Sequence, residues 1–247
     1  MANPELIAFV EQTFPLINKV GGAYYFTPET LAHGKSIGLN GLQFYFGGRG
    51  GVLGDVEEPV VTSAFAYFAP SMVKKFWDGA KAVMPPRQIA REHFICAHEF
   101  GRNLIGAIEG LVEFNEIASK VRSTIDPAGL ALYAGLAGEP MPADPQAAAY
   151  QHIMVLREFR GSAHIVAILG SGLDIHVADA ISSPENIKVH GYPEDALPVP
   201  TDEDRVIMDR ANVLTNELTA KAYAVLTATQ RQHFASTLTN IANQLPQ

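Results

Sequence analysis

The stretch LREFRGSAH, residues 156–164, decides how the centre of this chain folds. Residues three and four apart lie on one face of a helix, so the sequence places Arg157, Arg160 and His164 along a common side. Three groups that can carry positive charge, on a helix with a glycine at position 161, are typical of a binding site for an anion. The opposite stripe is apolar and is expected in the core; it consists of Val155, Leu156, Phe159, Ala163, Val166 and Ala167.

The rest of the chain shows the same helical period, and the alternation typical of strands is almost absent. A long helix is predicted from about residue 143 to 169. Further helices are expected after the cap Thr27 and at Pro59 and Pro70. From residue 87 to about 110, a stripe at helical spacing predicts another core-facing helix; it consists of His93, Ala97, Phe100 and Leu104. We therefore predict an all-α fold.

Glycine and proline concentrate in two segments that interrupt these helices. Residues 126–145 are predicted to form a loop that joins an N-terminal helical domain, 1–126, to a C-terminal helical domain, 143–247. Residues 182–200 are predicted to form a second irregular connection. The chain is long enough for one large domain or two small ones, and we expect two.

Two amphipathic helices are predicted at the C-terminal end. Thr201 precedes three carboxylates, and Thr227 is followed by Gln230 in a capping-box pattern. Such helices either complete the core or form the interface of a homodimer, and both interpretations remain open. Their apolar stripes are Ile207, Ala211, Leu214, Leu218 and Val225 in the first, and Phe234, Leu238, Ile241 and Leu245 in the second.

Composition and charge limit the function. A net charge of −8 opposes nucleic-acid binding, which needs a basic surface, although a local patch could still provide one. The single cysteine, Cys96, excludes an internal disulfide framework, and its setting is typical of a reducing compartment. Residues 1–5 show no basic region leading into an apolar segment, and no apolar run is long enough to span a bilayer. We therefore expect a cytoplasmic protein without membrane contact.

The second candidate site is LQFYFGGRGGVLG, residues 42–54, where aromatic residues lead into glycines around Arg49. Glycines let a backbone approach a ligand closely, Arg49 supplies a fixed charge, and Tyr45 can supply a hydrogen bond or a proton. No Lys-Ser/Thr pair follows and no strand is predicted before it, which excludes a nucleotide loop. The alternative is a helix end unwound by glycines with a surface arginine. Residues 64–70 are expected in the core, with Tyr67 lining a pocket.

The histidines do not predict a metal site. His93 and His98 are five residues apart and do not share a helix face, and Glu99 is not followed by a second histidine at a metalloprotease spacing. His93 is expected to be a hydrogen-bonded core histidine. His98 with Arg102 is either a solvated face or a second wall of the ligand pocket. No motif for a nucleophilic serine or cysteine is present, so we expect no cofactor, metal or covalent intermediate.

Three segments together resemble a known family. They are residues 45–54, the segment from Val60-Val61 to Pro70, and the stretch 156–164. This combination resembles a group of actinobacterial-type helical proteins that are labelled as a helix-turn-helix family and occur in specialised-metabolite contexts. The resemblance implies a winged-helix-like segment after the long helix, and the terminal helix pair is similar to the dimerising helices of MarR-type regulators.

The sequence departs from this pattern where DNA would bind. Between residues 176 and 201 there is too little chain for a recognition helix and a wing, so at most a reduced remnant is expected. The only lysine or arginine there is Lys188, against Asp179, Glu185, Glu194 and Asp195. A recognition helix needs several positive residues to contact phosphates. The resemblance therefore favours a ligand pocket, and we do not expect DNA binding.

The leading hypothesis is an enzyme of specialised metabolism that acts on a small carboxylate, sulfate or phosphate. Arg49, Arg157 and Arg160 would hold the anion, and His164 would move a proton because its ordinary pKa lies near neutral pH. The remaining polar and aromatic groups of the predicted site are Tyr45, Tyr67, His98 and Arg102. The alternatives are a dimeric MarR-like regulator that senses a metabolite, and a binding subunit without chemistry.

Overall fold

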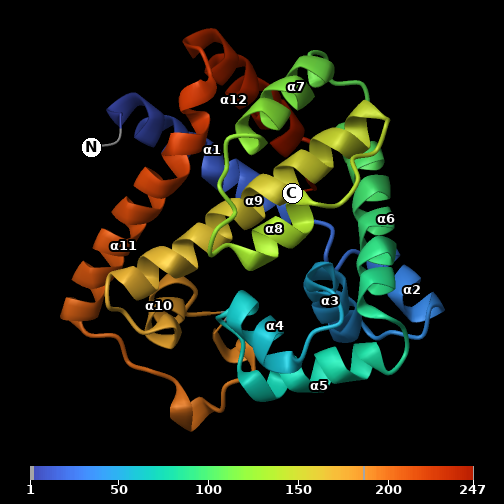
Figure 1. Cartoon of the computed structure of the whole chain (residues 1–247), viewed down its shortest axis with the longest axis vertical. Coiled ribbons are helices and arrows are strands. Elements are labelled where there is room, and N and C mark those ends of the chain that lie inside the picture. Colours follow the sequence, from blue (N-terminus) through green and yellow to red (C-terminus); the bar gives the residue numbers. More distant parts are fainter. Residues whose placement is uncertain (1–2, 186, 247) are drawn as a thin grey trace.

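The computed structural model describes residues 3–185 and 187–246, and in this part of the chain every regular element is a helix. The predicted all-α fold is confirmed (Figure 1). The α-helices are α1 (Pro4–Gly21), α2 (Pro28–Ser36), α3 (Gly41–Gly50), α4 (Glu58–Phe65), α5 (Pro70–Lys81), α6 (Pro86–Ile105), α7 (Leu111–Arg122), α8 (Ala131–Ala137), α9 (Pro145–Gly170), α10 (Ile175–Ser182), α11 (Asp202–Ala220) and α12 (Ala228–Ala242).

The helix starts follow the predicted caps. Thr27 and Thr227 each accept a hydrogen bond from the backbone N–H three residues further on, and Thr201 forms a capping box with Asp204. Pro59 and Pro70 lie in the first turns of α4 and α5. These positions are predictable because the first N–H groups of a helix need acceptors and proline there removes a donor that would be unpaired.

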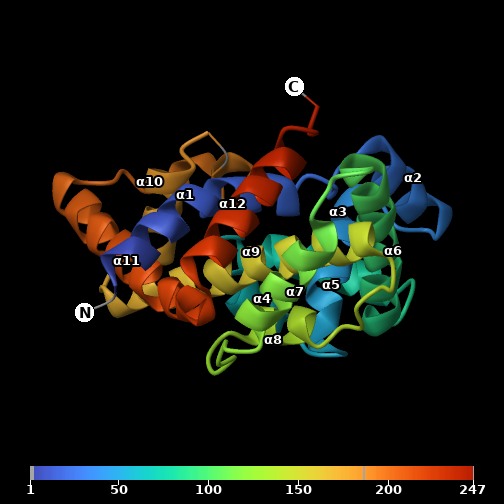
Figure 2. The same ribbon diagram turned by 90° about the horizontal axis from the view of Figure 1, so that it is seen from above.

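The long helix α9 is the centre of the molecule and contacts α1, α6, α7, α8 and α11. It crosses the middle of the view in Figure 1. Figure 2 shows α11 and the start of α1 at one end of the molecule, and α2 and α6 at the other. Because neighbours surround α9, almost every residue between Ala147 and Ser162 is buried or half-buried. The predicted apolar stripe is confirmed except for Val166, which is 44% exposed.

One large hydrophobic core contains residues from Leu6 to Ala242, on both sides of residues 126–145. A smaller cluster around Ile168, Ala178 and Met208 joins the end of α9 to α10 and α11. The prediction that residues 126–145 are a loop is wrong in its middle, where α8 packs against α9. Glycine and proline flank this helix and Gly135 lies within it, and its seven residues are too few to show a helical period in the sequence.

The glycines of α3 serve helix packing. Residues 41–50 form one regular helix, so the predicted unwinding at this point is wrong. A Cβ on Gly48 would lie 2.3 Å from the ring of His93, and one on Gly51 would lie 2.1 Å from the carbonyl oxygen of Pro86. Glycines therefore let α3 and the following 3-10 turn approach α6 closely. The backbone here approaches protein and not a ligand.

The C-terminal helices contribute to the core. α12 buries Phe234, Leu238 and Ile241, and its neighbours are α1 and α7. α11 packs on α9 and α1, and its buried residues include Met208, Ala211 and Thr215. The predicted stripe had Ile207 and Leu214 in place of Met208 and Thr215, so part of it is shifted by one residue. Between α10 and α11 the described residues form two 3-10 turns and no strand, so they contain no β-hairpin wing. No described helix combines the length and hydropathy needed to cross a membrane.

Candidate functional site

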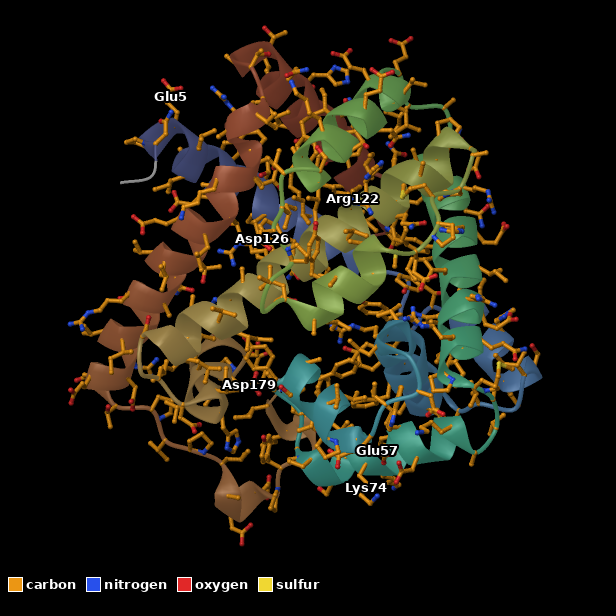
Figure 3. The ribbon with its side chains drawn as sticks, viewed as in Figure 1. Glu5, Glu57, Lys74, Arg122, Asp126 and Asp179 are labelled. Atoms are coloured by element: carbon orange, nitrogen blue, oxygen red, sulfur yellow. The ribbon has the colours of Figure 1, made fainter. Side chains whose placement is uncertain are left out.

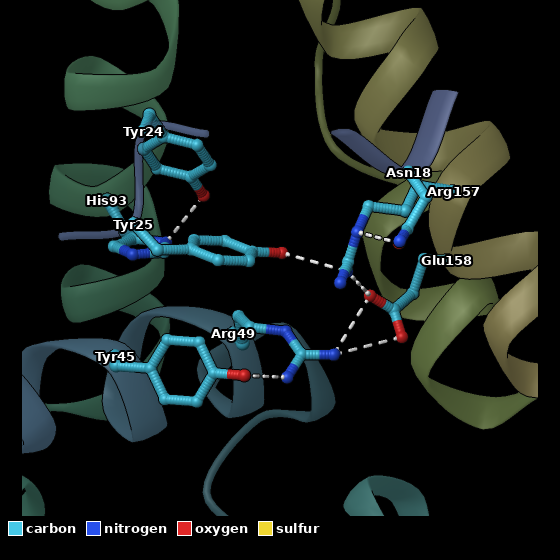
Figure 4. Close-up of polar contacts among 8 residues, drawn as sticks. All are labelled: Asn18, Tyr24, Tyr25, Tyr45, Arg49, His93, Arg157 and Glu158. Atoms are coloured by element: carbon cyan, nitrogen blue, oxygen red, sulfur yellow. Dashed lines mark hydrogen bonds and ion pairs between the residues drawn. The ribbon is translucent and has the colours of Figure 1, made fainter. Parts of the chain in front are cut away.

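The side chain of Arg49 forms a buried ion pair with Glu158 on α9. Arg49 Nη2 lies 3.1 and 3.0 Å from the two carboxylate oxygens, and Arg49 Nη1 donates to the Tyr45 hydroxyl at 2.6 Å (Figure 4). The two side chains are only 11% and 7% exposed, so the prediction of a surface arginine is wrong. The pair links α3 to α9, and its bonds are strong because charged groups donate and accept them away from water.

Aromatic rings surround the Arg49 guanidinium. Its central carbon lies 4.6 Å from the ring centre of Phe65, 5.2 Å from Tyr45 and 5.7 Å from Tyr25. These ring faces attract a cation and replace some of the water that burial removes. Burial opposes the charged form of Arg49, but the carboxylate of Glu158 and the two tyrosines outweigh it and hold the pKa well above its usual range.

Arg157 brings a second guanidinium to the same carboxylate. Arg157 Nη1 lies 3.8 Å from Glu158 Oε2, and the side chain donates to Asn18 Oδ1 at 3.1 Å and to the Tyr25 hydroxyl at 3.4 Å. The side chain is 25% exposed, and its Nη2 makes no hydrogen bond to a described residue. Two guanidiniums share one carboxylate, so the cluster keeps one net positive charge. Arg157 is its more exposed guanidinium.

The sequence prediction that Arg157 and Arg160 face the same way is confirmed, because both side chains contact α1. Arg160 lies one helical turn further along, where its guanidinium is 3.9 Å from the Phe14 ring centre and donates to Asn216 Oδ1 at 2.7 Å. His164 continues this side of α9 and hydrogen-bonds Thr215 at 2.9 Å. Burial, with Arg160 nearby, lowers the pKa of His164 to about 4. Arg160 and His164 therefore form a second cluster, packed against α11.

Gly161 is not required by the packing of α9. A Cβ at this position would meet only the Oε1 atom of Glu158, at an ordinary contact distance of 3.8 Å. This is the opposite of Gly48, where a Cβ has no room. The glycine that the sequence singled out thus leaves space beside the carboxylate that holds Arg49 and Arg157.

A strained turn after α4 orients three aromatic side chains. Ala66 has φ 54° and ψ −50°, and the Tyr67 N–H donates to the Phe65 carbonyl at 2.6 Å, which together define a γ-turn with positive φ. Such turns are costly for a residue other than glycine and are found where the surroundings impose them. Phe65 faces Arg49, and the Phe68 ring centre lies 6.0 Å from that of Tyr45. Burial, with Asp179 nearby, raises the pKa of Tyr67 above its usual range.

Asp179 and His190 form a polar pair at the same turn, and no sequence motif predicts this pair. Asp179 on α10 is buried and points toward α4 in Figure 3. Its Oδ2 lies 2.5 Å from His190 Nδ1, and the imidazole packs at 4.6 Å on the Phe68 ring. The His190 carbonyl accepts from the Ala69 N–H at 2.8 Å. A carboxylate at Nδ1 holds the histidine in the tautomer that leaves Nε2 as a proton acceptor.

A comparison with protein-family models matches residues 10–195 to a model described as "Helix-turn-helix family". The chain belongs to this helix-turn-helix family. The match covers about three quarters of the chain and includes both sides of the Arg49–Glu158 pair, the strained turn and the Asp179–His190 pair. No curated protein and no solved structure matches the chain.

The other predicted site residues of this helix-turn-helix family protein lie elsewhere. His98 hydrogen-bonds Gln151 at 2.8 Å, and Arg102 bonds Asp144 at 2.8 Å, both near the N-terminal end of α9. Arg102 is 40% exposed and lies on the solvated face of α6, whereas His98 is half-buried and its bonding partner Gln151 is fully buried. His93 is a buried core histidine bonded to the Tyr24 hydroxyl, as predicted. Among the described residues, no group of three metal-binding side chains is close enough to hold an ion.

Proposed function

We propose that this helix-turn-helix family protein binds a small anionic molecule at Arg157. The observation that carries the proposal is the charge of the cluster: Arg49 and Arg157 share the single carboxylate of Glu158, and Arg157 is the partly exposed member. Its Nη2 has no hydrogen-bond partner among the described residues. A guanidinium with an unpartnered nitrogen suits a carboxylate, sulfate or phosphate, which accepts charge-assisted hydrogen bonds.

The surroundings suit the organic part of such a ligand. Tyr25 and Tyr45 offer ring faces and hydroxyls beside the two guanidiniums, and the exposed Phe26 stacks on Tyr45 with ring centres 5.2 Å apart. Gly161 leaves space next to Glu158. Pockets for small molecules commonly combine apolar and aromatic walls with a few polar groups of this kind.

We extend the proposal to cofactor-independent proton transfer, in which Tyr45 and His190 take the leading parts. The Tyr45 hydroxyl accepts from Arg49, so its own hydrogen is free to be donated to a ligand. His190 presents Nε2 because Asp179 occupies Nδ1. His164, the group favoured by the sequence, bonds Thr215 on α11 instead and has its pKa lowered to about 4, so it is a weak base at neutral pH.

The binding proposal is tested by calorimetric titration with benzoate, phenyl sulfate and phenyl phosphate. We expect at least one of them to bind, and Arg157→Gln to weaken its binding by about tenfold or more, because a charge-assisted hydrogen bond is lost. Arg102→Gln is the matched control, since that arginine lies on the solvated face of α6. Equal affinity of wild type and Arg157→Gln would overturn the assignment.

The second candidate is a dimeric DNA-binding regulator, and the match to the helix-turn-helix family is compatible with DNA binding. The helix pair α5 and α6, joined by four residues, has the spacing of a helix-turn-helix unit. However, Lys74, Lys81 and Arg87 on this pair are each bonded to a carboxylate, and Figure 3 shows Lys74 at the outer edge of the molecule beside Glu57. Lys75 and Arg91 carry no such partner among the described residues.

Electrophoretic shift with genomic DNA fragments over a salt series tests the regulator. A regulator should bind in low salt, lose affinity steeply as salt rises, and lose it also in the double variant Lys75→Glu, Arg91→Glu. The variant Arg157→Gln is the control, because it alters the proposed ligand site only. Absence of any shift in low salt would exclude the regulator, and anion binding would then be the one remaining proposal.

A further inference from the structure

A cavity lies between α2, α6 and the C-terminal residues Gln244 and Pro246, outside the cluster around Arg157. Its volume is about 510 Å³, which is within the usual range of pockets that hold small molecules. The C-terminal tail leaves α12 on this side, as the free end in Figure 2 shows. The lining of the cavity includes part of α6, but neither the residues around Arg157 nor Lys75 and Arg91.

The floor of the cavity is an apolar face of α6. Ile95, Phe100 and Leu104 line it together with the thiol of Cys96. Ile95 is 48% exposed, which leaves much of a large apolar side chain in water. Burial raises the pKa of Cys96 to about 11, so the thiol remains protonated and acts here as an apolar group. Such a floor favours an apolar ligand body.

The rim of the cavity is negative. Glu29, at the start of α2, lines it and pairs with no cation among the described residues. Glu99 also lines it and is bonded to Arg102, while His33 is bonded to Glu92. None of the described residues that line the cavity is a lysine or an arginine. The hydroxyl of Thr27 and the amide of Asn103 add hydrogen-bonding groups at the same rim.

We infer that this cavity binds an apolar molecule that carries one positively charged amine, with the amine at Glu29 and the apolar body on Ile95 and Phe100. The ligand class is opposite in charge to that proposed for Arg157, because the groups that line the two places are opposite in charge. The inference does not depend on the proposed function.

Three dansyl probes of similar size test the inference by fluorescence titration: monodansylcadaverine with an ammonium group, N-butyl dansylamide without charge, and a dansyl aminobutyrate with a carboxylate. We expect the ammonium probe to bind about tenfold tighter than the carboxylate probe, and Glu29→Gln to reduce this preference severalfold. Glu109→Gln is the matched control, since Glu109 is exposed and lies outside the cavity.

Two measurements locate the bound probe. Asn103→Trp fills the rim and should abolish binding, whereas Val112→Trp, on the exposed face of α7, should not. Because Cys96 is the single cysteine, a bound probe should also slow its reaction with a small thiol reagent in wild-type protein. Arg157→Gln should leave binding of the ammonium probe unchanged. Equal binding of all three probes would overturn the inference. So would binding that survives in Asn103→Trp and does not protect Cys96.

Discussion

Arg49 and Arg102 occupy the last turns of α3 and α6, and each bonds a carboxylate on or beside α9, yet their surroundings differ. Arg49 and its partner are nearly excluded from water, whereas Arg102 and Asp144 are 40% and 35% exposed. Water screens the second pair, so it contributes little to stability. The first pair cannot lose one member without leaving a charge stranded among aromatic rings. The environment of an arginine, and not its place in a helix, therefore decides its importance.

The largest effect is expected from Glu158→Gln. Among the described residues, Glu158 carries the one carboxylate bonded to Arg49, so its removal should lower the free energy of unfolding by about 3 kcal/mol, measured by urea denaturation. Asp144→Asn, which keeps a capping group at α9 but removes the charge beside Arg102, should cost less than about 1 kcal/mol. Similar losses in the two variants would contradict the distinction drawn between the pairs.

A second effect concerns the packing of α3, which places Arg49. Gly48→Ala should destabilise the protein by about 2 kcal/mol, because the new methyl group overlaps the ring of His93 and forces α3 and α6 apart. Thermal unfolding followed by circular dichroism measures this loss. An unchanged melting temperature would show that the two helices can separate without penalty.

The histidines give a pH-dependent test. His164 has a folded-state pKa of about 4, below its ordinary value, so the unfolded chain binds the proton more readily. The stability from this group is complete above about pH 6.5 and is lost as pH falls toward 4. His93 and His152 act in the same direction.

His164→Gln should therefore flatten the acid side of the stability curve by on the order of 2 kcal/mol. Urea midpoints between pH 7 and pH 4 measure it. His33→Gln, at a half-exposed histidine on α2, is the control. A curve for His164→Gln that is parallel to the wild-type curve would show that His164 is not held neutral by the fold.

The smallest effect should have the opposite sign. Gly161→Ala meets no close neighbour and should stabilise α9 by about 0.5 kcal/mol, because alanine loses less entropy in a helix. Gly161→Leu should also fold but should block anion binding at Arg157 in the same calorimetric titration. Unchanged binding in the leucine variant would mean that the space beside Glu158 is not used by the ligand.

Local patterns predicted the helices well. The caps at Thr27, Thr201 and Thr227 and the length of α9 follow from hydrogen bonds and periodicity within a few residues, so they are visible in the sequence. The short helix α8 was missed because seven residues carry too little period. The prediction of separate domains at residues 126–145 remains a proposal, although the core contains residues from both sides.

The candidate site was predicted only in part. Arg49, Arg157 and Tyr45 were singled out by residue type, and they do lie around one carboxylate. Glu158 was not predicted because the arginines on either side of it indicated a site for an external anion, and not an ion pair within the protein. Asp179 and His190 were missed because they are distant from any motif and meet only where the chain between α10 and α11 passes the strained turn.

The sequence by itself determined the all-α class, most helix boundaries and the common side of Arg157 and Arg160, because these depend on contacts between residues close in the chain. Only the tertiary structure decided that Arg49 is buried, that Glu158 neutralises one of two guanidiniums, and that Gly48 is needed where Gly161 is not. Those properties depend on which helices approach each other and how closely, and the packing of the whole chain sets that approach.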